Sequence, residues 1–311
     1  MCILAVYVDD MIITGPSAEW IGAFKQDLAR RFSIKDLGEC SWILGMAVCR
    51  DRAQHIIKLH QSKYIDDMLE KFNMVDAKEV VTPATPGTTA PPTNDNHSEL
   101  SADTPYQALV GSLLYAAVAT RPDISEAVSR LCRAMARPTP WHWDQAKRVL
   151  RYLKGTKEHG PCFLGNTKTG TLTGASDADW AGDAERRRST TGYIFKLCNA
   201  AVSWKSQLQT TVALSTAEAE YMALCAAVQE ALFLRRMLSE MGFVQREPTV
   251  ILEDNQSCIA LANNNMTHGR SKHIDIRYHF TRECVESGQI VLNYCPTEDM
   301  LTDQGTGAHQ A

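Results

Sequence analysis

Two short apolar runs at the start of the chain flank a pair of acids. Residues 3–14 read ILAVYVDDMIIT, with β-branched and aromatic residues on both sides of Asp9 and Asp10. This pattern predicts a β-hairpin with the two acids at its tip. A solvated turn is the alternative explanation for an isolated Tyr-x-Asp-Asp sequence.

Helical and strand-like patterns follow this hairpin. Ile21, Phe24, Leu28 and Phe32 share one stripe of a predicted helix, which Ser17 caps and which ends near Gly38. Two predicted strands and a second predicted helix follow, up to Phe72. Residues 1–81 are therefore predicted to form a small α+β unit.

The middle of the chain changes from a polar linker to helices. Residues 82–105 contain five of the chain's twelve prolines and almost no large apolar side chain, which is typical of a linker. Apolar positions at three- and four-residue spacing then predict three helices within residues 106–160. These lie at 106–119, 123–136 and 141–154.

Residues 171–308 show the alternation of an α/β domain. Four short β segments are predicted, the last at 212–215, followed by a long helix at 216–241 that Gly242 ends. The compact apolar run before Asp254 is typical of a strand buried on both faces of a mixed sheet. Two helices and a final strand follow, so the fold class is α/β with helices flanking the sheet.

Composition narrows the function only slightly. A formal net charge of -4 and a pI near 6.1 argue mildly against nucleic-acid binding over the whole surface. The ten cysteines form no Cys-x-x-Cys pair, which predicts free and mostly buried thiols in a reducing compartment. The longest apolar run, 108–119, is too short to span a bilayer, and the N-terminus lacks the basic region of a signal peptide. We therefore expect a soluble intracellular protein with no membrane partner.

A local basic stretch stands out against this acidic background. Between residues 130 and 160 there are eight Lys or Arg and two acids. The stretch is either a solvated helix face or a cradle for a phosphate backbone, with two tryptophans available for stacking. The residues predicted to bind nucleic acid are Arg130, Arg133, Arg137, Lys147, Arg148, Arg151 and Lys154.

Glu220 is the most instructive acid in the C-terminal region. Ser215 and Glu218 have the spacing of a capping box at the start of the long helix, so Glu218 already has a structural role. Glu220 instead shares its helix face with the apolar stripe that must pack on the sheet. A carboxylate buried there must be protonated, ion-paired or bound to a metal.

Three further acids are candidates for the same site. Asp254 follows the apolar strand at the sheet edge where ligands bind in open α/β folds, although a helix cap is an equal alternative. Asp177 and Asp179 alternate on an extended segment, so both would face one side, and only one need be a ligand. Asp303 is the weakest of the set, because a solvated tail is its default explanation.

The ordered blocks of this chain closely resemble the Pol region of Ty1/copia-type LTR retrotransposons. The matching stretches include YVDDMIITG, LVGSLLYAAVATRPDI, SDADWAGDAERRRSTTGYIF, LSTAEAEYMAL, EDNQSCIAL and SKHIDIRYHFTRECV. The resemblance covers nearly the whole chain except the proline-rich linker and the last few residues.

This resemblance implies a partial reverse-transcriptase palm, a helical thumb or connection region, and a C-terminal ribonuclease H domain. It implies that Asp177, Glu220, Asp254 and Asp303 hold two Mg²⁺ ions, with Mn²⁺ as an alternative, and cleave the RNA strand of an RNA–DNA hybrid. His273 and His279 lie in a typical family block, but the sequence assigns neither a role.

Two departures from the family pattern define the alternative hypothesis. Asp9 and Asp10 lack the third upstream carboxylate of a polymerase site, so we expect no DNA synthesis by this chain alone. Gly305 and Gly307 would fray the helix that positions Asp303. The alternative is therefore a catalytically inactive retrotransposon relic that at most binds nucleic acid.

Overall fold

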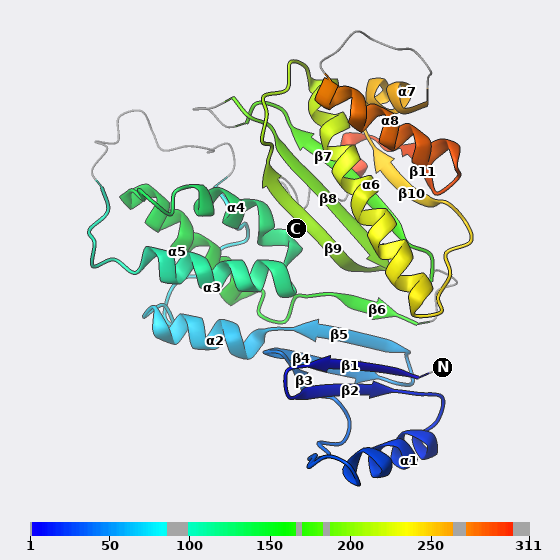
Figure 1. The fold of residues 1–311 in the computed structure, drawn as a ribbon. Helices are drawn as coiled ribbons and strands as arrows, with labels where there is room; N and C mark the ends of the chain where they lie inside the picture. The colour runs from blue at the N-terminus through cyan, green and yellow to red at the C-terminus, as the bar shows by residue number, and fades with distance from the viewer. Residues whose placement is uncertain (1, 86–98, 166–169, 183–186, 264–271, 301–311) are drawn as a thin grey trace.

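The fold is described from a computed structural model. The structure describes the chain apart from residues 1, 86–98, 166–169, 183–186, 264–271 and 301–311 (Figure 1). Much of the predicted linker and the whole segment around Asp303 therefore lie outside the described residues.

The N-terminal hairpin is confirmed. Strands β1 (Ile3–Tyr7) and β2 (Asp10–Thr14) pair in antiparallel fashion, with Tyr7 opposite Asp10 across a two-residue turn. Both acids are exposed.

The helix after the hairpin is shorter than predicted. Helix α1 covers Ala18–Ala29, with the Ser17 hydroxyl accepting a hydrogen bond from the Trp20 backbone. The predicted end near Gly38 is wrong. Beyond the helix the Asp36 carboxylate accepts hydrogen bonds from both Lys25 and the Gly38 backbone, and these hold a separate turn.

A second, four-stranded sheet joins segments that lie far apart in the sequence. Its antiparallel order is β3-β4-β5-β6. The strands are β3 (Trp42–Ile43), β4 (Met46–Asp51), β5 (Ile56–His60) and β6 (Cys162–Leu164). Helix α2 (Ser62–Lys71) follows β5 directly and carries the buried residues Ile65, Met68 and Leu69.

The three predicted central helices are present with slightly different ends. They are α3 (Tyr106–Ala119), α4 (Ser125–Arg133) and α5 (Pro140–Gly155), with a 3-10 turn η1 (Pro122–Ile124) between the first two. One hydrophobic core includes residues of these helices and of α2. This core contains residues from both sides of the linker. The predicted domain boundaries at residues 81 and 105 therefore stay a prediction.

The C-terminal region contains a mixed five-stranded sheet in the order β11-β10-β7-β8-β9. Strands β7 (Thr173–Asp179), β8 (Thr190–Leu197) and β9 (Ala200–Leu208) are antiparallel neighbours, whereas β10 (Thr249–Glu253) is parallel to both β7 and β11 (Ile290–Tyr294). The β segment predicted at 212–215 is wrong. These residues connect β9 to the long helix, and the Leu214 backbone N–H donates to Glu218 instead of pairing in a sheet.

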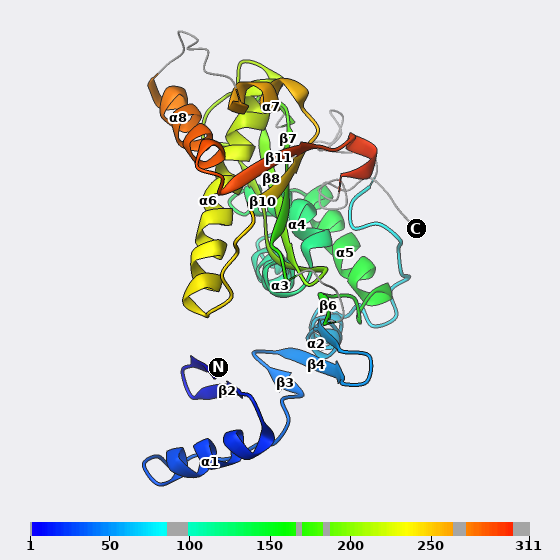
Figure 2. The ribbon, with the colours of Figure 1, turned by 90° about the vertical axis from the view of Figure 1, so that its right-hand side faces the viewer.

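Helices cover both faces of this sheet (Figures 1 and 2). Helix α6 (Thr216–Glu240) packs on β7 and β8. Beside it, α7 (Gln256–Asn263) contacts β10 and β11, and α8 (Lys272–Glu286) contacts β11, whereas α4 contacts β9. The last element of the described chain is a short 3-10 turn, η2 (Thr297–Asp299). This mixed sheet with flanking helices confirms the predicted α/β fold class.

The structure tests the expectation about the cysteines. All ten cysteines are free, but only Cys225, Cys258 and Cys284 are buried, so the expectation of mostly buried thiols is wrong. Over the part of the chain that the structure describes, no helix is long and apolar enough to cross a membrane.

Candidate metal centre

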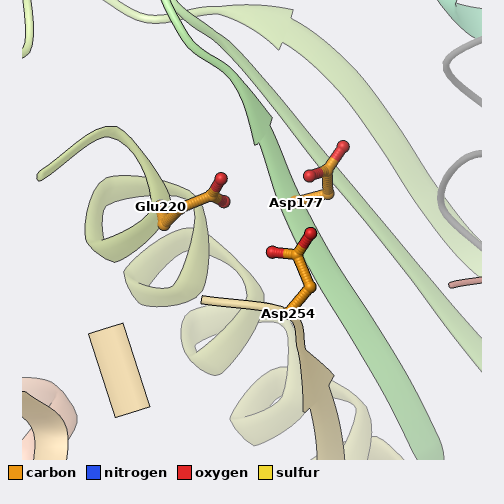
Figure 3. A group of neighbouring side chains, drawn as sticks. All are labelled: Asp177, Glu220 and Asp254. Carbon is orange, nitrogen blue, oxygen red and sulfur yellow. The ribbon is translucent and has the colours of Figure 1, made fainter. Parts of the chain in front are cut away.

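Three of the predicted acids meet at one end of the five-stranded sheet (Figure 3). Asp177 lies on β7, Glu220 lies near the start of α6, and Asp254 directly follows β10. Each carboxylate offers one oxygen, and these oxygens lie within 4.8 Å of one another. The fold therefore brings together side chains from three separate elements.

The local structure explains why these acids converge. Strands β7 and β10 are parallel neighbours with Leu252 opposite Ala175, so both chains reach the same sheet edge two residues later. Helix α6 begins at Thr216, because the Ser215 hydroxyl accepts a hydrogen bond from the Glu218 backbone and caps the helix. Glu220 thereby lies in the first turns of the helix and faces the strand ends.

Glu220 is an unusual side chain for a helix packed on a sheet. It is 7% exposed, and its Oε2 atom has no hydrogen-bond partner among the described residues. Burial raises the pKa of this carboxyl to about 10, with further contributions from the charges of Glu253, Asp177 and Asp254. Without a cation the group is therefore neutral at pH 7.

These properties fit a divalent cation. An orphaned carboxylate oxygen in a nearly buried position is costly unless a positive charge compensates it. Within the described part of the chain, no Lys or Arg forms an ion pair with Glu220 or Asp254. Clustered carboxylate oxygens are the donors that hard ions such as Mg²⁺ prefer, so Asp177, Glu220 and Asp254 could hold one.

Three neighbours of the site were not identified by sequence reasoning. The Thr297 hydroxyl donates to Asp254 Oδ2 at 2.5 Å, and the Ser176 hydroxyl donates to Glu253 Oε2 at 2.8 Å. Thr297 is separated from Asp254 by 43 positions, so no local pattern could reveal this contact. For Glu253, the available signal was a charge at the end of an otherwise apolar strand.

The remaining predicted acids are placed differently. Asp179 is exposed, and Asp9 and Asp10 lie on the N-terminal hairpin, outside the three-acid cluster. Asp303 lies outside the described residues, as does the side chain of His273. His279 lies on the exposed side of α8, and its role stays unassigned.

Most of the predicted nucleic-acid-binding cations already have partners within the chain. Arg130 pairs with Glu126 and Lys147 with Asp144. Arg133, Arg148 and Lys154 donate hydrogen bonds to Thr190, Thr82 and the Ala77 backbone, respectively.

Two members of the basic set differ from the others. The structure gives no hydrogen bond or ion pair to the side chains of Arg137 and Arg151 among the residues it describes. Arg137 is exposed and Arg151 is half-buried. The guanidinium of Arg151 also lies near enough to Arg148 to add to the effect of burial, which lowers the pKa of Arg148. The basic stretch is thus partly internal structure and partly available surface.

Comparison with known proteins adds evidence independent of the site geometry. A family model described as reverse transcriptase (RNA-dependent DNA polymerase) matches residues 1–86. The retrovirus-related Pol polyprotein from transposon TNT 1-94 of Nicotiana tabacum is 44% identical over 308 residues. That match covers 96% of this chain and 23% of the relative, so the chain spans about a quarter of the relative's length.

A shorter relative and a solved structure agree with this result. The putative transposon Ty5-1 protein YCL074W of Saccharomyces cerevisiae is 33% identical over 228 residues, which is 73% of each chain. A foamy viral protease-reverse transcriptase in complex with dsDNA aligns with 94% of this chain and 55% of its own, with a TM-score of 0.52 and 14% identity, and so supports the fold. The chain therefore belongs to the Pol polyproteins of Ty1/copia-type retrotransposons.

Proposed function

We propose that the chain carries a divalent-metal-dependent ribonuclease site that cleaves the RNA strand of RNA–DNA hybrids, as part of a retrotransposon reverse transcriptase. The observation that carries this proposal is the convergence of Asp177, Glu220 and Asp254, with an unpartnered buried oxygen on Glu220. Membership of the Pol family and the RNase H-like fold support the substrate class.

The three acids would divide the work of holding the cation. Asp177 and Asp254 approach from adjacent strands, whereas Glu220 approaches from the helix beside them (Figure 3). Two Mg²⁺ ions, or Mn²⁺ in their place, fit the proposal, with Asp303 as a fourth ligand from the C-terminal segment. When bound, the ions supply Lewis-acid stabilisation of the charge that develops on the scissile phosphate.

The protein's own groups preorganise this site. Thr297 fixes one oxygen of Asp254, so the other oxygen can face a cation. Glu220 lies near the N-terminal end of α6, and the positive end of the helix dipole there would favour a nearby phosphate of the hybrid. Arg137 and Arg151 are proposed to contact more distant phosphates of the hybrid.

A product analysis with matched substrates tests the proposal. The purified chain is incubated with Mg²⁺ and an end-labelled RNA annealed to DNA, with double-stranded RNA and double-stranded DNA of the same sequence as controls. We expect internal cleavage of the RNA in the hybrid only, and none in EDTA. Hybrid binding that weakens steeply with salt but yields no cleavage would instead favour a nucleic-acid-binding relic.

A further inference from the structure

A buried hydrogen-bonded pair lies directly behind the two aspartates of the metal centre. Ser176 immediately precedes Asp177 on β7, and Glu253 immediately precedes Asp254 at the end of β10. The two strands are parallel neighbours, and Ala175 opposite Leu252 is the last matched position before this pair. On both strands, the hydrogen-bonded residue therefore lies one position before the aspartate.

The contacts of Glu253 extend across both strand ends. Its Oε2 accepts a hydrogen bond from the Ser176 hydroxyl at 2.8 Å, and its Oε1 accepts one from the Asn255 backbone at 3.3 Å. The first contact fixes the residue before Asp177, and the second fixes the residue after Asp254. One carboxyl group thus connects the chain segments that carry both aspartates.

Burial makes this arrangement expensive as a purely structural device. Ser176 and Glu253 are both 0% exposed, and no Lys or Arg among the described residues pairs with Glu253. A buried carboxyl without an opposite charge costs more than an apolar side chain of similar volume. An apolar residue would pack between the sheet and α6 at lower cost, but it could not hold two hydrogen-bond donors.

Glu253 is also distinct from the metal ligands. The three ligand acids share one cluster of oxygens within 4.8 Å, and Glu253 is not in that cluster. Both of its oxygens are engaged by Ser176 and Asn255. Its carboxyl is therefore directed to the backbone segments beside the ligands.

We propose that Glu253 and Ser176 are positioning residues, which set the spacing of Asp177 and Asp254 and so determine cation affinity at the proposed ribonuclease site. This inference rests on the proposed function for the identity of the ligands. Groups that orient the ligands of a metal typically change metal affinity by about 10- to 100-fold when they are removed.

The chain offers a matched control for this pair. The Ser203 hydroxyl on β9 donates to Glu230 Oε1 on α6 at 2.7 Å, which is a partly buried serine-to-glutamate hydrogen bond between the same sheet and its helix. Neither residue adjoins Asp177, Glu220 or Asp254 in the sequence. Ser203→Ala therefore removes a comparable bond that has no connection to the ligands.

The test measures Mn²⁺ binding by calorimetry on the full chain, together with the melting temperature in EDTA. The variants are Ser176→Ala, Glu253→Met, Glu253→Gln and Ser203→Ala. We expect Ser176→Ala and Glu253→Met to raise the Kd for Mn²⁺ about tenfold or more. Glu253→Gln keeps an acceptor oxygen and should stay within about threefold of the wild type, as should Ser203→Ala.

The metal-free melting temperature separates positioning from general stability. Glu253→Met removes a buried carboxyl but also leaves the buried Ser176 hydroxyl without this acceptor, so its melting temperature in EDTA is measured beside its Mn²⁺ affinity. A weaker Mn²⁺ affinity in a variant that is no less stable supports the proposal. Ser176→Ala, which removes a single oxygen, provides the same comparison if Glu253→Met does not fold.

Two results would overturn the inference without affecting the proposed function. One is a wild-type chain that binds Mn²⁺ and cleaves the hybrid, with Ser176→Ala binding Mn²⁺ equally well. The other is a Glu253→Gln variant as weak as Glu253→Met, because the contribution would then be charge. A wild type that neither binds Mn²⁺ nor cleaves the hybrid would overturn both proposals.

Discussion

At the scale of single residues, the carboxyl of Glu220 links folding to pH. Its pKa of about 10 in the metal-free fold lies far above the ordinary value of 4.5. Between these values the folded chain holds one proton more than the unfolded chain at this position. The free energy of unfolding therefore falls as pH rises, by at most about 1.4 kcal/mol per pH unit for one proton.

Replacing Glu220 tests this linkage. In EDTA, Glu220→Gln should be more stable than the wild type at pH 8–9 and should lose less stability between pH 6 and pH 9, because its amide does not titrate. Urea unfolding across that pH range measures the effect. Asp179→Asn is the control, since Asp179 is exposed. Equal slopes for Glu220→Gln and the wild type would contradict the raised pKa.

Residue patterns in the sequence predict only some members of the site. Glu220 could be identified because a charge stands in an apolar helix stripe, and Asp254 because it follows an apolar strand. Thr297 and Ser176 could not, because their importance comes from hydrogen bonds formed across 43 and 77 positions. A sequence can show a charged residue at a position where an apolar one is expected. The side chains that form hydrogen bonds with that residue are known only from the tertiary structure.

At the scale of elements, the start of α6 controls the position of Glu220. The Ser215 hydroxyl caps the helix, and the Glu218 carboxylate accepts from the Leu214 backbone, one residue earlier than in the predicted capping box. Periodicity predicted this helix to within one residue at its C-terminal end. Periodicity gave a wrong prediction for the β segment at 212–215, because this apolar run connects β9 to the capped start of α6.

A capping variant tests this role of the element. Ser215→Ala should lower the free energy of unfolding by about 1 kcal/mol, because the Glu218 backbone N–H loses its acceptor. It should also weaken Mn²⁺ binding, since the first turns of α6 carry Glu220. Denaturant unfolding and calorimetry measure the two effects. Ser239→Ala, an exposed serine near the other end of α6, should change stability by less than about 0.5 kcal/mol.

At the scale of the whole molecule, the helices α3–α5 and the five-stranded sheet are joined by specific contacts. Arg133 on α4 donates to Thr190 on β8, and the Trp204 indole on β9 donates to the Ala117 backbone on α3. Sequence patterns predicted the elements on both sides of this junction. They could not predict the junction itself, because its partners are separated by 57 and 87 positions.

The partition of the basic residues leads to a prediction about hybrid binding. The double variant Arg137→Ala/Arg151→Ala should bind the hybrid more weakly. The slope of the logarithm of its binding constant against the logarithm of salt concentration should fall by about 1 for each phosphate that the variant no longer neutralises. Fluorescence anisotropy at several salt concentrations, in EDTA to prevent cleavage, measures this slope. Arg236→Ala is the control, because Arg236 is an exposed residue that pairs with Glu240. An unchanged slope in the double variant would remove both arginines from the interface.

The most direct test of the central claim is the single-turnover rate of hybrid cleavage in two matched aspartate variants. In Mg²⁺, Asp254→Asn should lower the rate by at least about 100-fold, because a ligand carboxylate becomes a neutral amide. Asp179→Asn removes a nearby exposed carboxylate and should cleave within about threefold of the wild-type rate. Equal cleavage by Asp254→Asn and the wild type would contradict a metal centre formed by Asp177, Glu220 and Asp254.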